Sequence, residues 1–521
     1  MTGVGRLAAS GSLSAPRVLA WMVAALACGA VPAAALEGPL GLFPGELFRA
    51  VQVERVDDAE ALLAAEPLAP AAGLYYFQGE WIAVPQADMP VTGRPFDGPA
   101  APDLPLPPIV WLAAPELVEG ARLAGDDRLR LPDGSVVAFD VVSPSPTNTL
   151  YLDRTTYAFY RERSLRLRGR FEELPDGGRR FVARTIWPED ARIPWRDLQV
   201  DAVEQPATLG DLVQAQAPAW PDARLLWERP GQGPRRWSAR PVLAIVLGGA
   251  QADAPGSQAG HIAVATGRLG ARGEWAHWLA NNVYPLDVVG EKGIASGPVP
   301  MDNYLADLNA GQALYRPVYA LVAVLDDPAA ARTVQAAFQE LFLAYWCHEV
   351  TFDRARHNST EMSLGVLRDA GWRVPRVGRT SRLKGLLAAI GAAVVTFDWD
   401  LVRDAWGFFT EERTDLLPRV AFEVAARDLL GLLEGVDGAE EPPRPLSELE
   451  LRLREDTDAV LFLRFPQVPS RRPFGTYPVG SLRQYRARIE LDEAPLDPTP
   501  ARERPFPEEL RRHCRGGEAR P

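Results

Sequence analysis

Two segments of the chain carry the residue types best suited to chemistry. His261 follows Gly260 at the start of an apolar stretch, and Ser359 follows Asn358 at the start of an apolar helical pattern. A serine nucleophile needs a base within hydrogen-bond reach, a group that orients the base, and donors for the oxyanion. The pair therefore predicts an acyl-transfer site in which Ser359 attacks and His261 takes its proton.

The remaining roles fall to nearby polar residues. His277 or Asn281, on the chain that returns after the His261 strand, would orient the imidazole. The first turn of a helix offers unpaired amide hydrogens and a favourable dipole. Asn358 and the amide of Ser359 are therefore expected at the oxyanion site.

Each of these residues also has a purely structural interpretation. Asn358 and Glu361 have the spacing of a helix capping box. His261 can be a structural histidine at the start of a strand, and His277 a member of an aromatic cluster. Ser359 would then be a vestigial nucleophile in a domain used for binding or scaffolding.

The order of elements resembles that of circularly permuted papain-like proteins, in which a histidine strand precedes an Asn-Cys helix. It is similar in particular to the Lnb N-terminal periplasmic domain family. The matching segments are Gly260-His261, 275–279, 281–284, 290–297, 317–324, a long helix ending near Tyr345, and Asn358-Ser359. The resemblance implies a permuted papain-like domain that acts on an amide or ester of the cell envelope: a peptide, a peptidoglycan stem or a lipid acyl chain. Ser359 replaces the family's cysteine, and a hydroxyl is far less acidic than a thiol.

Cys347 offers two further hypotheses. As an alternative nucleophile it falls at the end of a helix, where the dipole does not help it. With His348 and His357 it could bind zinc, but adjacent residues rarely ligate one tetrahedral ion together. We expect no metal or cofactor. Cys347 is either a buried thiol or the partner of Cys514 in an oxidising compartment.

The first 35 residues have the charged, apolar and small-residue order of a secretory signal. Cys28 lies in a partial lipoprotein box, and an uncleaved anchor is a third alternative. We expect an exported, periplasmic protein that associates with the membrane only if Cys28 is lipidated. The net charge of −12, with arginines spread along the chain, argues against nucleic acid as a partner.

The remaining pattern predicts an α+β protein with a β-rich region at 36–234, an α+β domain at 235–400, a helical and β region at 401–495, and a disordered tail at 496–521. The resemblance implies that the domain at 235–400 is permuted papain-like. Strands are expected at 74–84 with an internal turn, 165–187 as a hairpin, 242–247, 260–266, 275–279, 316–324, 459–465 and 485–491. Helices are expected at 56–65, 327–345, 360–370, 401–406 and 416–433, and a linker or loop-rich passage at 206–234.

Overall fold

The fold is described from a computed structural model. It describes residues 36–54, 70–86, 89–92, 104–142, 152–200, 207–214, 222–231, 233–248, 260–286, 288–289, 296–308, 318–353, 357–378, 381–396, 398–435, 444–465, 468–469, 502–503 and 506–515. The expected signal sequence, the helix at 56–65 and the strand at 485–491 lie outside these residues.

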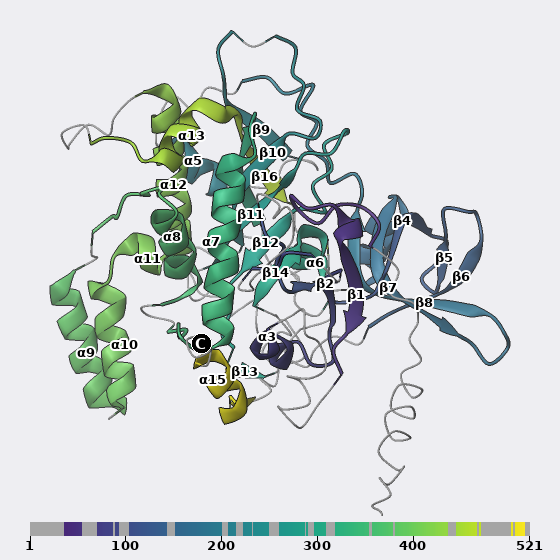
Figure 1. The fold of residues 1–521 in the computed structure, drawn as a ribbon, viewed down its shortest axis with the longest axis horizontal. Coiled ribbons are helices and arrows are strands. Elements are labelled where there is room, and N and C mark those ends of the chain that lie inside the picture. Colours follow the sequence, from purple (N-terminus) through teal and green to yellow (C-terminus); the bar gives the residue numbers. More distant parts are fainter. Residues whose placement is uncertain are drawn as a thin grey trace, which may run out of the picture.

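A seven-stranded antiparallel sheet forms the centre of the molecule (Figure 1). Its strands, in spatial order, are β14 (Gly297–Pro300), β12 (Leu279–Asn282), β11 (His261–Arg268), β10 (Pro241–Gly248), β15 (Val318–Leu325), β16 (Thr457–Phe465) and β9 (Asp222–Glu228). β9 and β16 come from outside the expected central segment 235–400. The sheet thus draws strands from both flanking regions of the sequence.

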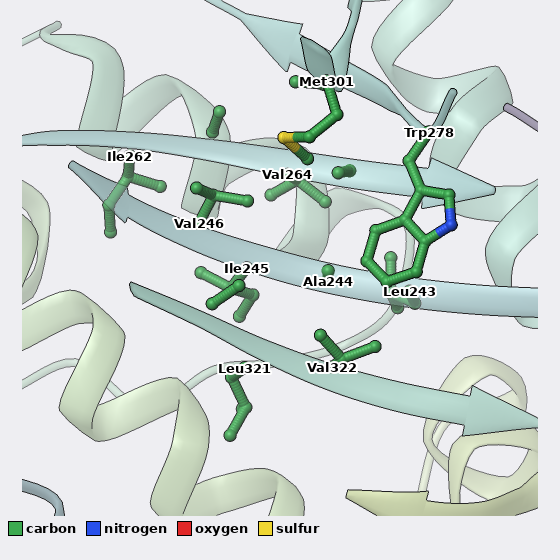
Figure 2. Close-up of a cluster of buried hydrophobic side chains, with 14 of the residues drawn as sticks. Leu243, Ala244, Ile245, Val246, Ile262, Val264, Trp278, Met301, Leu321 and Val322 are labelled. Carbon is green, nitrogen blue, oxygen red and sulfur yellow. The ribbon is translucent and has the colours of Figure 1, made fainter. Parts of the chain in front are cut away.

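The central strands are buried on both faces. Every residue of β10 and β15 is buried, which explains their continuous apolar sequences. Figure 2 shows Leu243, Ile245 and Val246 of β10 packed among side chains of the neighbouring strands β11 and β15. The strands expected at 242–247, 260–266, 316–324 and 459–465 are therefore confirmed within the described residues.

The N-terminal part is rich in β-structure. β1 (Phe48–Gln52), β2 (Trp81–Pro85) and β3 (Val110–Trp111) form a small sheet, with the short helix η1 (Gly45–Leu47) before β1. β4 (Glu116–Leu123), β5 (Arg128–Arg130), β6 (Val136–Val141), β8 (Arg179–Pro188) and β7 (Leu165–Glu173) close into a five-stranded barrel, and α4 (Arg154–Arg161) precedes β7. The antiparallel pairing of β7 with β8 confirms the expected hairpin.

Helices cover the central sheet. α7 (Ala329–Trp346), α8 (Ser359–Asp369) and α12 (Pro418–Glu434) each pack against β10 or β11. The others are α3 (Ala71–Tyr76), α5 (Ala207–Gln214), α6 (Met301–Ala306), α9 (Arg382–Thr396), α10 (Trp399–Thr410), α11 (Arg413–Leu416), α13 (Glu448–Asp456) and α15 (Glu508–Arg515). The α+β class is confirmed, and so are the helices expected at 327–345, 360–370, 401–406 and 416–433.

Two expectations fail because packing overrides local sequence preference. Residues 74–76, which are rich in aromatic side chains and expected as a strand, form the end of α3, which packs against α7 and α15. The expected linker at 206–234 contains α5 and the edge strand β9, which pairs with β16.

Two further boundaries differ from expectation. The return strand is β12 at Leu279–Asn282 rather than residues 275–279. The expected disordered tail contains β17 (Arg502–Glu503), which pairs with β13 (Val288–Val289), and the helix α15. A disulfide between Cys347 and Cys514 attaches α15 to the end of α7. This corrects the interpretation of Cys347 as a free buried thiol.

Candidate active site

His261 is the first residue of β11, and its side chain is almost fully buried. Its Nε2 lies 2.6 Å from Oδ1 of Asn282 on the neighbouring strand β12. Because an amide oxygen only accepts hydrogen bonds, Nε2 carries the hydrogen in this contact, and Nδ1 of the neutral ring is the acceptor nitrogen. The contact therefore orients the imidazole and selects the tautomer that a general base requires.

The asparagine in contact with His261 is Asn282, one position after the expected Asn281. Successive side chains of a strand point to opposite faces of the sheet. Asn281 Nδ2 donates to Val264 O (3.0 Å) and to Gln335 Oε1 (3.2 Å), and Gln335 Nε2 donates back to Asn281 Oδ1 (3.1 Å). Asn281 therefore attaches β12 to α7. The difference follows from the expected position of the return strand, which did not indicate which residues of β12 share a face of the sheet with His261.

His277 is also in the wrong place for the orienting role. Its Nε2 lies 2.9 Å from the carbonyl oxygen of Arg268, the last residue of β11. His261 is the first residue of that strand, and the two ends of β11 are roughly 23 Å apart at the usual rise per residue. Burial, with the charge of Arg166 adding to it, lowers the pKa of His277. His277 is a neutral, structural residue of the aromatic segment.

Ser359 is the first residue of α8, as the sequence predicts. The N-cap is Asn358, whose Oδ1 accepts hydrogen bonds from Thr360 N (2.8 Å) and Glu361 N (3.1 Å). Glu361 does not complete a capping box, since its carboxylate lies 3.2 Å from His357 Nδ1. The Ser359 side chain is 7% exposed, and within the described part of the chain its hydroxyl makes no hydrogen bond.

The elements around β11 show which end of the strand Ser359 approaches. Near the C-terminal end of α7, the Tyr345 hydroxyl donates to Tyr284 O at 2.7 Å. The ring of Tyr284 lies against the ring of His261, with centroids 6.3 Å apart. The end of α7 therefore lies at the His261 end of β11.

Helix α8 then runs back beside α7. Just after the end of α8, Gly371 O accepts a hydrogen bond from the Ser447 hydroxyl, next to α13. The other end of α13 lies near the start of α7, because Asp326 N donates to Asp456 O at 2.7 Å. Since α8 also packs against β11 and α7, its N-terminus lies at the same end of the sheet as His261. The fold thus brings Ser359 and His261 to one end of the strand.

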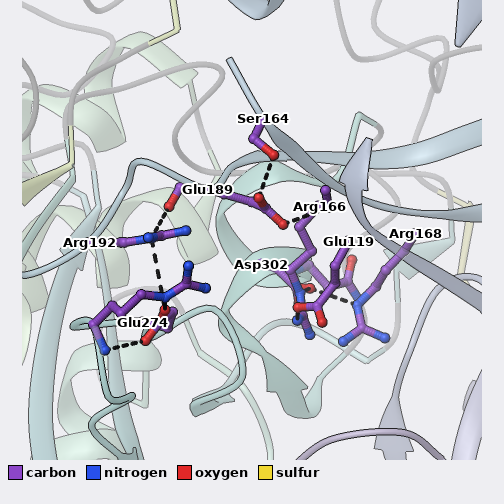
Figure 3. Close-up of polar contacts among 11 residues, drawn as sticks. Glu119, Ser164, Arg166, Arg168, Glu189, Arg192, Glu274 and Asp302 are labelled. Atoms are coloured by element: carbon purple, nitrogen blue, oxygen red, sulfur yellow. Dashed lines mark hydrogen bonds and ion pairs between the residues drawn. The ribbon is translucent and has the colours of Figure 1, made fainter. Parts of the chain in front are cut away.

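A buried ion cluster joins the barrel to α6, the helix that carries a second aromatic neighbour of His261. The ring of Tyr304, on α6, lies 6.3 Å from the His261 ring. Asp302 on the same helix accepts from Arg166 Nε (2.7 Å) and Arg168 Nε (2.9 Å) of the barrel strand β7, as Figure 3 shows. Burial would raise the pKa of Asp302, but the two guanidinium groups outweigh burial and hold it below its ordinary value. The ion cluster thereby attaches α6, which carries Tyr304, to the barrel.

The other sequence hypotheses for this region do not fit. The Cys347 sulfur is bonded to Cys514, so it is neither a nucleophile nor a zinc ligand in this state. Among the described residues, no group of three or more His, Cys, Asp or Glu side chains is placed to hold a metal ion. Two surface hollows of about 700 and 610 Å³ lie around Arg196, and neither is lined by His261 or Ser359.

Known protein families, curated proteins and solved structures give no match to this chain. Sequence reasoning found His261, Ser359 and the capping role of Asn358, and missed Asn282, Tyr284 and Tyr304. The adjacent pair Asn281-Asn282 was a usable signal, because one of two successive strand residues must share the face of the histidine.

Proposed function

We propose that this chain is an exported hydrolase or acyltransferase with a permuted papain-like domain. Ser359 is its nucleophile, His261 its general base and Asn282 the residue that orients the base. The observation that carries the proposal is the 2.6 Å contact between His261 Nε2 and Asn282 Oδ1, at the end of the sheet where Ser359 begins α8. Nucleophile, histidine and asparagine together form the constellation of papain-like enzymes.

In the proposed reaction, Ser359 Oγ attacks the carbonyl carbon of an amide or ester while His261 Nδ1 accepts the hydroxyl proton. The amide at the N-terminus of α8 stabilises the developing oxyanion. His261 then returns the proton to the leaving amine or alcohol, and an acyl-serine remains. Water or an acceptor nucleophile, deprotonated by His261, releases the acyl group. The substrate class is an envelope peptide, a peptidoglycan stem or a lipid acyl ester.

A second candidate function is non-catalytic binding in the cell envelope. The burial of both side chains favours it, as does the lack of a hydrogen bond from the Ser359 hydroxyl within the described residues. Asn358 also has a sufficient structural reason to be present, because it caps α8. In this function the papain-like fold would be retained without covalent chemistry.

Labelling with a fluorophosphonate probe separates the two functions. Ser363 provides a matched control, since it is buried on the same helix one turn after Ser359. The enzyme proposal predicts that wild type and Ser363→Ala are labelled and that Ser359→Ala is not. Labelling that persists in Ser359→Ala would reject Ser359 as the nucleophile, and an unlabelled wild type would favour the binding function.

A further inference from the structure

Helices α9 and α10 form a hairpin with an unusual surface. Figure 1 shows the pair projecting from the rest of the molecule at the lower left. Of the nine large hydrophobic side chains that are exposed in the described part of the chain, seven belong to this hairpin. They are Leu383, Leu386, Leu387, Ile390, Val394, Trp399 and Trp406. The exposed apolar surface is therefore concentrated on one element.

The five aliphatic residues of α9 form a single stripe, which we call the α9 stripe: Leu383, Leu386, Leu387, Ile390 and Val394. At 3.6 residues per turn they fall within an arc of about 100°. Leu383 and Val394, at its two ends, are both 68% exposed. The sequence contains no charged residue between Lys384 and Asp398, so no charge interrupts the stripe.

The opposite face of α9 carries small residues and packs against α10. Gly385 is buried there, and a Cβ added to it would lie only 3.1 Å from Thr410 Cγ2 and 3.5 Å from Trp406 Cε3. Ala388, Ala389 and Ala392 share this face of the helix. In a water-soluble hairpin the large apolar residues normally face inward. Small residues between helices and large aliphatic residues outside are the arrangement found in lipid.

The polar and aromatic residues at the ends of the hairpin indicate what kind of apolar partner the α9 stripe contacts. Arg382 and Lys384 are exposed in the first turn of α9, where the helix dipole disfavours cations, so helix stability does not account for them. Exposed basic residues beside an apolar stripe complement anionic lipid headgroups. Trp399, at the turn of the hairpin, is 81% exposed, and tryptophan is enriched at membrane–water interfaces.

The length of α9 limits how the hairpin can meet a bilayer. Fifteen residues span about 22 Å, less than the roughly 30 Å of a hydrocarbon core. No helix in the described part of the chain is long and apolar enough to cross a membrane. The exposed Asp398 at the turn also opposes insertion with the turn leading. A flat orientation places the α9 stripe in the apolar layer and keeps Arg382 and Lys384 at headgroup level.

We propose that the α9–α10 hairpin is a membrane-surface anchor, which lies flat on an anionic bilayer with the α9 stripe inserted among the acyl chains. The inference goes beyond the proposed chemistry and does not depend on it. It differs from attachment through a lipidated Cys28, because it places the contact in the folded part of the chain. It would hold the protein at a lipid surface without a membrane-spanning helix.

Vesicle flotation with the full chain tests the anchor, using phosphatidylcholine vesicles with or without 30% phosphatidylglycerol. The wild type is expected to float with the anionic vesicles. Leu387→Glu/Ile390→Glu should bind them at least tenfold more weakly, because two charges enter the α9 stripe. Arg382→Glu/Lys384→Glu should lose the preference for anionic vesicles. Val136→Glu, at a comparably exposed valine of the barrel, should float as the wild type does.

Three results would overturn the anchor. One is a wild type that floats with neither vesicle. Another is equal binding by Leu387→Glu/Ile390→Glu, which would assign flotation to a different segment, such as the apolar N-terminus that all variants share. The third is a wild type that forms dimers without binding vesicles, with Leu387→Glu/Ile390→Glu monomeric, since the α9 stripe would then contact a second copy. Circular dichroism of each variant confirms that the fold is retained.

Discussion

His261 and Asn282 are joined by a 2.6 Å contact between an imidazole nitrogen and an amide oxygen. The contact connects β11 to β12 at the end of the sheet where α8 begins. The neighbouring Asn281 serves a different purpose, because its amide is bonded to Gln335 of α7. The two adjacent asparagines thus have different roles: Asn282 orients the candidate base, and Asn281 attaches β12 to α7.

This division predicts different outcomes for two similar substitutions. Asn282→Ala and Asn281→Ala each leave a buried polar partner unsatisfied, so each should lower the free energy of unfolding by about 1–3 kcal/mol. Only Asn282→Ala should also slow fluorophosphonate labelling, by about tenfold or more, because the imidazole loses its orientation. Thermal unfolding and labelling rates measure the two effects. Equal slowing by Asn281→Ala would show that labelling reports stability alone.

Asp428 predicts a pH-dependent loss of stability. Burial raises the pKa of Asp428 to about 6, and the Glu450 charge adds to the increase, although the hydrogen bond from Trp372 Nε1 (2.7 Å) opposes it. At this site the folded protein therefore binds more protons than the unfolded chain between about pH 4 and 6, and the contribution of Asp428 to the free energy of unfolding falls as pH rises through that window. The expected loss is on the order of 2–3 kcal/mol.

Asp428→Asn should remove this loss while keeping an acceptor for Trp372. At pH 8 the variant is expected to be more stable than the wild type by a similar amount, and at pH 4 the two should be nearly equal. Urea unfolding at both pH values measures the difference. A stability difference that is the same at pH 4 and pH 8 would show that Asp428 does not titrate in this window.

The disulfide between Cys347 and Cys514 joins positions 167 residues apart and fastens α15 to the end of α7. Closing so long a loop restricts the unfolded chain, so Cys347→Ser/Cys514→Ser should lower the free energy of unfolding by about 2–5 kcal/mol. Reduction of the wild type should produce the same loss. Thermal unfolding with and without a reductant checks both, and a reductant-insensitive wild type would indicate that the bond does not form.

The sequence predicted those elements whose pattern is local. β10 and β15 are continuous apolar runs, and the β7–β8 hairpin has alternating residues around a Pro-Asp-Gly-Gly turn. Asn358 and Ser359 were placed correctly because a helix start has a short-range signal. The long helix α7 was also found almost to its last residue.

The remaining parts depend on contacts between distant segments. β9 becomes a strand because it pairs with β16, more than 200 residues later, and α15 is fastened by the disulfide. Asn282 rather than Asn281 faces His261, because the pairing of β12 with β11 and β14 determines which residues of β12 lie on each face of the sheet. A single sequence without those pairings places the asparagine pair near the histidine but does not show which member faces it.

The central claim is that His261 accepts the proton of the side chain at position 359. The pKa of a thiol introduced at that position reports this interaction directly. In a Cys28→Ser background, we would measure the pH dependence of iodoacetamide alkylation for Ser359→Cys, with Ser363→Cys as the control one turn along α8. The account predicts a thiol pKa well below the ordinary value of about 8.5 for Ser359→Cys, and a clear rise of that pKa towards the ordinary value in His261→Ala. A thiol pKa at position 359 that is ordinary or raised, and unchanged by His261→Ala, would contradict the account.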